Sequence, residues 1–201
     1  MPSVTEELIK AANSSAENDT SLNSAERSFD TEGEAAGFFR TAVPMLFDIE
    51  MWNECGTASE FAVFDEDGEP AGPKFGEGRF IRIYLKATAK YDWVRVQKIH
   101  RSDDEAVVTV KPTCDPTQKP VDKSVISHFF SDEATNNFCL MKHGRSVSFY
   151  VVGIGEKQNT TQTGGMVETL RNVAAANLGY YLGIQKAEWK MFCVKFLELA
   201  G

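Results

Sequence analysis

The chain has 201 residues, a formal net charge of −8, 42% hydrophobic residues and 25% charged residues, which suits one sizeable domain with its own core. An acidic chain repels phosphate backbones, so we expect no nucleic-acid partner. No apolar run reaches the roughly 18–20 residues of a membrane span, and the first residues lack the basic and apolar regions of a secretory signal. We therefore expect a cytoplasmic protein, or one inside an organelle after loss of a transit peptide, and not a secreted one.

Residues 1–30 are rich in Ser, Asn, Glu, Asp and Ala and contain few aromatic residues. A segment of this composition buries too little apolar surface to fold alone, which predicts an extended, mostly irregular N-terminal arm. Within the arm, Ser3 and Glu6 have capping-box spacing, which predicts one short helix at Val4–Ala12. We expect residues 31–201 to form a single α+β domain.

The residues after the arm predict a helix and then a run of strands. Thr31 and Glu34 form a second capping box, and the spacing that follows predicts a helix over about Glu32–Phe47, which Pro44 bends or ends. Strand-like segments separated by turn signals come next. They are Ile49–Cys55, Glu60–Phe64, Phe80–Lys86, Trp93–His100, Ala106–Lys111 and Val125–Phe130.

The stretch Ser124–Gly155 contains the clearest hairpin, in which Phe138–Met141 and Ser146–Val152 meet across a short turn. Two helices are predicted after it, at Met166–Leu182 and Gln185–Leu199. The second has the strongest amphipathic pattern of the chain. Its apolar face consists of Trp189, Phe192, Cys193, Phe196 and Leu197.

This order of elements predicts an α+β fold with a curled antiparallel sheet of about six to seven strands and two C-terminal helices packed on it. No stretch matches the residues of a family. Only the layout is similar to helix-grip and lipocalin-type ligand binders, and a shared layout does not imply a shared function.

Strand alternation indicates one apolar and one mixed face of the sheet. Ile81, Ile83 and Leu85 share the apolar face. The mixed face, which we call the Arg/aromatic face, consists of Phe80, Arg82, Tyr84, Trp93, Arg95 and Tyr150. A flat face of these residue types is typical of a protein interface, whereas a concave face closed by a helix would make a pocket for an amphipathic or anionic ligand. An ordinary half-solvated sheet face is the third alternative.

Catalytic and metal-binding patterns are weak. The sequence has no GxSxG or SxxK motif, and its four cysteines are widely spaced without a CxxC pair, so we expect reduced, packed thiols, no metal and no cofactor. His128 precedes Asp132 and Glu133, which would allow a His/carboxylate pair for general-base work. The alternative is a histidine at a strand end beside a capped turn.

The main functional hypothesis is therefore a non-enzymatic interaction or structural protein, a subunit or linker of a larger assembly. Its contacts to other protein subunits would be residues 1–30 and the Arg/aromatic face. The alternative hypothesis is a small-molecule binding protein, with a pocket for an amphipathic or anionic ligand between the curled sheet and the C-terminal helices.

Overall fold

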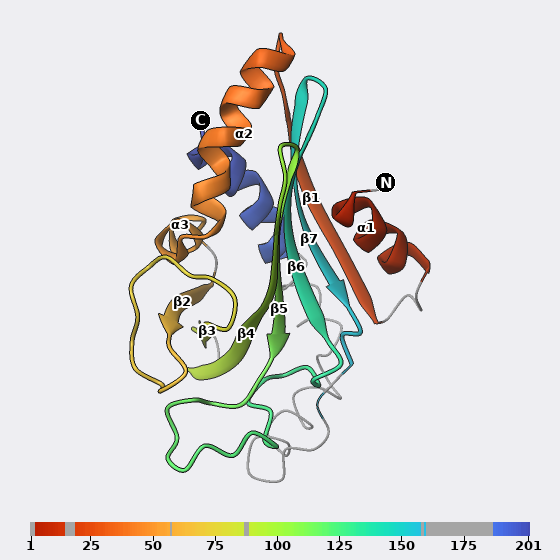
Figure 1. The fold of residues 1–201 in the computed structure, drawn as a ribbon. Helices are drawn as coiled ribbons and strands as arrows, with labels where there is room; N and C mark the ends of the chain where they lie inside the picture. Colours follow the sequence, from red (N-terminus) through yellow and green to blue (C-terminus); the bar gives the residue numbers. More distant parts are fainter. Residues whose placement is uncertain (1–2, 15–18, 57, 87–88, 158, 160–186) are drawn as a thin grey trace.

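The computed structural model describes residues 3–14, 19–56, 58–86, 89–157, 159 and 187–201. They form a curled seven-stranded antiparallel sheet with helices on both of its faces, which confirms the predicted α+β class (Figure 1). The strand order is β1-β7-β6-β5-β4-β3-β2, so strands β2 to β7 follow one another across the sheet and β1 pairs with β7. The predicted helix Met166–Leu182 lies outside the described residues.

The N-terminal residues are folded to a greater extent than expected. Helix α1 (Val4–Ser14) begins after the capping box of Ser3 and Glu6, as predicted. Strand β1 (Thr20–Ser28) then pairs along its whole length with β7 (Ser146–Ile154). The expectation of a mostly irregular arm over residues 1–30 was therefore wrong, because a strand at the edge of a sheet is stabilised by backbone pairing that composition does not report.

Helix α2 (Glu32–Leu46) begins at the predicted capping box. The Glu34 backbone N–H donates to Thr31 Oγ1 at 3.1 Å, and the Thr31 N–H donates to the Glu34 carboxylate at 3.0 Å. Pro44 lies in the last turn, so the helix ends two residues after it.

Helix α3 (Ile49–Glu54) replaces the strand expected at Ile49–Cys55. Asp48 caps the helix by accepting a hydrogen bond from the Glu50 N–H at 3.1 Å. The buried residues Ile49 and Trp52 are one helical turn apart, so the helix brings both to the core, which an alternating strand would not do.

The remaining strands agree with their predicted positions to within a few residues. They are β2 (Ser59–Phe64), β3 (Phe80–Leu85), β4 (Lys90–Arg101), β5 (Glu105–Pro112), β6 (Thr135–His143) and the already named β7. The expectation of a strand at Val125–Phe130 was wrong, because this segment is a loop. In it, His128 Nδ1 accepts the Phe130 N–H at 2.9 Å, a local bond that competes with strand pairing.

The main core lies between one face of the sheet and the helices α2, α3 and a C-terminal helix at residues 187–199. We call this face of the sheet the inner face (Figure 1). The predicted apolar side of the last helix is confirmed, because Phe192, Cys193 and Phe196 are fully buried in this core. Many of the largest core side chains are aromatic, and Trp52 contacts four phenylalanine rings.

The opposite, outer face carries α1. Ala12 packs there against Val107, Cys139 and Val152 of the sheet, with Leu8 beside them. The carboxylate of Glu105 accepts the backbone N–H groups of the first turn of α1. α1 is thereby held to the sheet at its N-terminus and along its apolar side.

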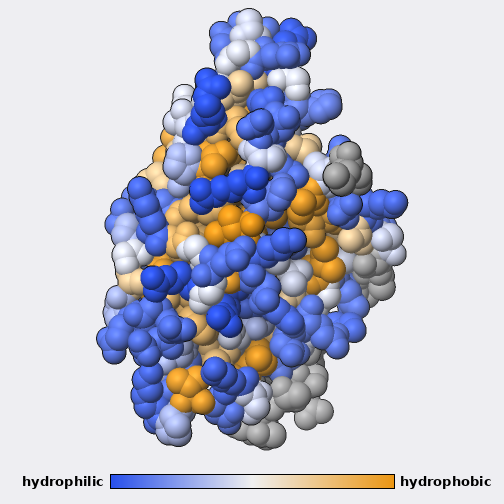
Figure 2. Space-filling view, viewed as in Figure 1, coloured by the Kyte–Doolittle hydropathy of each residue, from blue (hydrophilic) through white to orange (hydrophobic). Residues whose placement is uncertain are grey.

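The exposed surface is mainly polar. Figure 2 shows polar side chains over most of the side of the molecule that faces the viewer, with apolar ones in small areas between them. Within the described residues, no helix combines the length and the apolar character needed to cross a membrane.

Candidate functional site

The Arg/aromatic face lies on the outer face of the sheet. Phe80 pairs with Arg95, and Arg82 pairs with Trp93, so these side chains share one side of β3 and β4. Ile81 and Val94 alternate with them and belong to the core on the inner face. These predicted residues therefore point away from the C-terminal helix, and the idea that they line a pocket beneath it was wrong.

Most of the Arg/aromatic face forms one connected group. The guanidinium carbon of Arg82 lies 4.9 Å from the centre of the Phe64 ring and 4.7 Å from that of Tyr91. The Tyr91 ring packs against that of Tyr84 with 5.1 Å between the ring centres, and Tyr91 is 48% exposed. Sequence reasoning missed Tyr91 because it began the strand at Trp93.

Tyr150 is separate from this group. It belongs to β7, with β6 and β5 between that strand and β4. Its ring packs in the apolar cluster beneath α1, together with Val152 and Ala12. The structure thus brings together five of the six predicted residues and leaves Tyr150 apart.

His128 faces the carboxylate of Asp92, which was not among the partners expected from the sequence. Its Nε2 atom lies 3.9 Å from Asp92 Oδ2, and both side chains are largely buried. Burial lowers the pKa of His128, although the Asp92 carboxylate acts in the opposite direction. Burial likewise raises the pKa of Asp92, against the effects of His128 and of a hydrogen bond from the Phe129 backbone.

The contacts of this pair favour a structural role. Nδ1 accepts a backbone N–H and Nε2 faces Asp92, so both ring nitrogens of His128 point at protein atoms. Glu133, one of the partners expected for it, is instead bonded to Lys157 at 2.9 Å. The pair fastens the loop around His128 to β4. In the described part of the chain, no group of three or more His, Cys, Asp or Glu side chains is arranged to hold a metal.

Polar side chains gather on the inner face where β1, β7 and β6 meet the beginning of the C-terminal helix. Ser21, Gly153 and Asn136 are direct neighbours across the three strands. Two residues further along each strand, Asn23, Val151 and Phe138 form the next inward row. The Trp189 ring lies 5.4 Å from that of Phe138, which places the first turn of the helix over these rows.

Because Gly153 has no side chain, the Glu156 carboxylate can lie directly over β7 between β1 and β6. A Cβ atom at residue 153 would overlap the Glu156 carboxylate and the Ser21 hydroxyl. With glycine there, the Ser21 hydroxyl donates to Glu156 Oε1 at 3.1 Å, above the strand. We call Ser21, Asn23, Asn136, Glu156 and Trp189 the inner polar cluster.

Three buried polar atoms of the inner polar cluster have no hydrogen-bond partner among the residues that the structure describes. They are Asn23 Nδ2, Asn136 Oδ1 and Trp189 Nε1. Asn23 is only 8% exposed. An unpaired buried polar group costs about 1–3 kcal/mol, so a molecule that bonded these atoms would recover that free energy.

Sequence reasoning missed the inner polar cluster. The available signal was asparagine at Asn23 and Asn136, at positions of strands where an apolar residue is expected to face the core. Their proximity could not be predicted from the sequence, because neither β1 nor the sheet face that the C-terminal helix covers was known.

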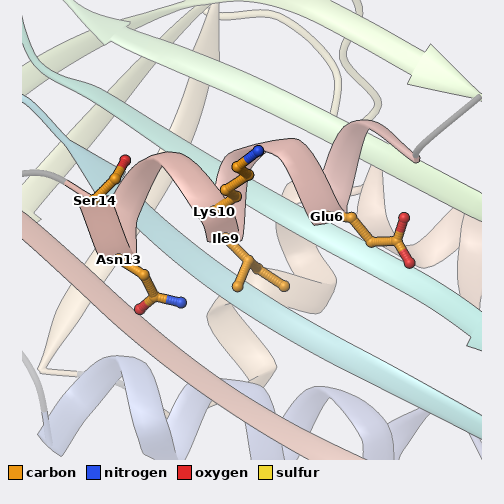
Figure 3. Close-up of a pocket in the computed structure, with 5 residues that line it drawn as sticks. All are labelled: Glu6, Ile9, Lys10, Asn13 and Ser14. Atoms are coloured by element: carbon orange, nitrogen blue, oxygen red, sulfur yellow. The ribbon is translucent and has the colours of Figure 1, made fainter.

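A different depression lies beside α1 on the outer face, with a volume of about 470 Å³. Figure 3 shows the side chains that line it, spread along this one helix. They are Glu6, Ile9, Lys10, Asn13 and Ser14. Four of the five are exposed, so the depression offers no buried polar group to a ligand.

No protein-family model matches the sequence, and no curated protein matches it. Among solved structures, the chain is similar to the hypothetical protein jhp0584 from Helicobacter pylori, with a TM-score of 0.55, 8% sequence identity and coverage of 91% of this chain and 88% of that one. The chain is also similar to TTHA0849 from Thermus thermophilus, with a TM-score of 0.46, 10% sequence identity and coverage of 90% of this chain and 97% of that one. A START superfamily protein from Mycobacterium smegmatis has a TM-score of 0.38, 8% identity and coverage of 86% and 97%.

At 8% identity, the first of these similarities shows the fold alone. The chain is an α+β protein whose curled antiparallel sheet holds a C-terminal helix against its inner face, with a polar cluster at the start of that helix.

Proposed function

We propose that this protein binds a small amphipathic molecule between the inner face of its sheet and the beginning of the C-terminal helix. The observation that carries the proposal is a set of three buried atoms, on Asn23, Asn136 and Trp189, that have no hydrogen-bond partner among the described residues and that lie on the inner face near the start of the C-terminal helix. A polar group of the ligand pairs with one or more of these atoms, and its apolar part lies against the Trp189 ring.

The packing of the core supports this end of the helix as the binding position. Trp52 is 1% exposed, and Phe149 and Phe192 are completely buried. These side chains fill the middle of the space between sheet and helix, where a ligand would have to displace them. Trp189, one turn before Phe192, is only partly buried and therefore reachable.

Asn136→Leu tests this proposal, since leucine is close to asparagine in size and removes the unpaired acceptor. We expect the unliganded variant to be as stable as the wild type or up to about 1 kcal/mol more stable. We expect its affinity for decanol, followed by tryptophan fluorescence and calorimetry, to fall about tenfold.

Asn13→Leu is the matched control, because Asn13 is exposed on α1, and its affinity should not change. Native mass spectrometry of the purified protein adds a second measurement. If no small molecule co-purifies and decanol does not bind the wild-type protein, the proposal is wrong.

The Arg/aromatic face supports a second proposal, a contact surface for an acidic segment of another protein. Arg82 is held between two aromatic rings, Tyr91 beside it is 48% exposed, and Lys111 pairs with Arg95 on the next strand. Arginine and tyrosine are among the residue types most often found at the energetic centre of interfaces. Residues 1–30 are not part of this proposal, because α1 and β1 pack on the sheet of their own chain.

The double variant Arg82→Ala, Tyr91→Ala should lose the crosslinks that the wild-type protein forms with neighbours in cells. Lys98→Ala, at another exposed position of β4, should keep them. Loss of one hot-spot pair costs about 2 kcal/mol or more, enough to weaken an association roughly thirtyfold. Identical crosslinking of the double variant and the wild type would exclude this surface.

A further inference from the structure

We infer that the acidic segment that docks on the Arg/aromatic face belongs to a second copy of this chain, so that the protein forms a two-fold symmetric dimer. The inference rests on the contact surface proposed above and names the partner that was left open there. The segment is the turn after β2, which we call the acidic turn. It consists of Asp65, Glu66, Asp67, Gly68 and Glu69.

The acidic turn lies next to the Arg/aromatic face within one chain. It begins directly after Phe64, whose ring centre lies 4.9 Å from the guanidinium carbon of Arg82. Phe64 also forms a bridge with Pro70, so the turn folds back on itself at the end of β2. An anionic and a cationic group are therefore neighbours at this end of the sheet.

The charges of both groups are available to another molecule. Glu66, Asp67 and Glu69 are exposed, and their carboxylates form no ion pair among the described residues. In the same part of the chain, Arg82 and Arg95 form no ion pair either. Arg95 is exposed and Arg82 is partly exposed, so both guanidinium groups can meet a carboxylate from outside.

The acidic turn has a fixed shape. The Asp65 carboxylate accepts the N–H groups of Asp67 and Glu69, both at 3.0 Å. Gly68 has a φ of +77°, and a Cβ atom there would lie 2.3 Å from the Pro116 carbonyl oxygen. The central guanidinium of the Arg/aromatic face is likewise held between two rings. Groups that are ordered before they associate lose less conformational entropy on binding, which favours the contact.

A two-fold axis between the two groups makes this surface complementary to itself. The acidic turn of each copy then faces Arg82 and Arg95 of the other, and both contacts form at once, as an isologous interface requires. Tyr91, which is 48% exposed beside Arg82, shields the ion pairs from water. An acidic segment of a different protein would instead lie beside the acidic turn, where like charges repel and the turn stays unpaired.

Analytical ultracentrifugation of the wild-type protein and of two charge reversals tests the inference. We expect a wild-type dimer at a concentration of about 100 µM. Arg95→Glu and Glu66→Arg should each weaken the dimer at least about tenfold, because each substitution occurs twice in a symmetric interface and brings like charges together. Lys98→Glu on β4 and Glu7→Arg on α1 make the same charge changes at other exposed positions and should leave the dimer unchanged.

An equimolar mixture of Arg95→Glu and Glu66→Arg provides the sharpest measurement. In a mixed dimer, one contact joins the two reversed positions and the other joins the two unchanged ones, so opposite charges meet in both. We expect the mixture to dimerise about as tightly as the wild type, which misfolded variants would not do. A monomeric wild type, a dimer that either reversal leaves intact, or a mixture that stays monomeric would overturn the inference.

If a reversed variant does not fold, as judged by circular dichroism, Arg95→Gln and Glu66→Gln replace the pair. Each should weaken the dimer about threefold or more, while Lys98→Gln should not, and an unchanged dimer would contradict the inference. Crosslinking in cells separates the inference from the contact surface on which it rests. A monomeric protein whose crosslinks to different proteins depend on Arg82 and Tyr91 overturns the second copy alone, and one without such crosslinks overturns the contact surface as well.

Discussion

Replacement of Trp52 by alanine is expected to lower the free energy of unfolding by about 3–5 kcal/mol, the range for removal of a large buried aromatic side chain. Trp52 is 1% exposed, and its indole N–H donates to the Leu46 carbonyl oxygen at 3.0 Å. Its ring contacts aromatic rings from β2, β6, the C-terminal helix and the segment after β2. They are Phe61, Phe138, Phe192 and Phe75.

Urea denaturation followed by circular dichroism measures this loss. Met51→Ala, at the partly exposed neighbouring position of α3, should cost no more than about 1 kcal/mol and is the control. Trp52→Phe should fall between the two, because it keeps part of the ring contacts and loses the hydrogen bond to Leu46. A loss below about 2 kcal/mol for Trp52→Ala would contradict the central position that the structure assigns to this side chain.

Replacement of Glu105 by glutamine is expected to loosen α1 from the outer face and to cost about 2 kcal/mol, because charge-assisted hydrogen bonds are lost. Glu105 is 5% exposed and accepts the N–H groups of Val4 at 2.9 Å and of Thr5 at 3.0 Å. His100 Nε2 lies 3.1 Å from the same carboxylate. A glutamine has one acceptor oxygen and no charge to place at the positive end of the helix.

The contribution of Glu105 should also depend on pH. Burial by itself would raise the pKa of this carboxyl, but the hydrogen bonds from Thr5 and Val4, together with His100, outweigh it and hold the pKa below its ordinary value of 4.5. A group with a lowered pKa in the folded state stabilises fully above its unfolded-state pKa. That stabilisation is lost as the pH falls through the folded-state pKa.

Hydrogen exchange of the α1 amides tests both statements. At neutral pH, exchange in Glu105→Gln should be roughly tenfold or more faster than in the wild type, and the difference should shrink in acid as wild-type Glu105 becomes protonated. Glu7→Gln, an exposed position in the first turn of α1, should behave nearly as the wild type. Equal protection of α1 in Glu105→Gln and wild type would show that the carboxylate does not hold the helix.

The sequence by itself determined those features whose signals lie within one helical turn or one strand. The capping boxes at Ser3 and Thr31 marked the starts of α1 and α2. Alternation in β3 and β4 correctly indicated which side chains share a face. The spacing of Phe192 and Phe196 identified the buried side of the last helix. Such patterns arise from local backbone geometry and are therefore readable without the fold.

Only the tertiary structure decided the features that depend on contacts between distant segments. Residues 20–28 form a strand because their backbone pairs with β7 along its whole length. Residues 49–54 form a helix, and this conformation buries both Ile49 and Trp52 in the core. The position of the helices α2, α3 and 187–199 determined which sheet face is the inner one. This choice placed Arg82 outside and Asn136 inside, although strand alternation treats the two faces alike. The candidate site therefore could not be predicted from the sequence, because its residues come together only when β1, β6 and the C-terminal helix pack.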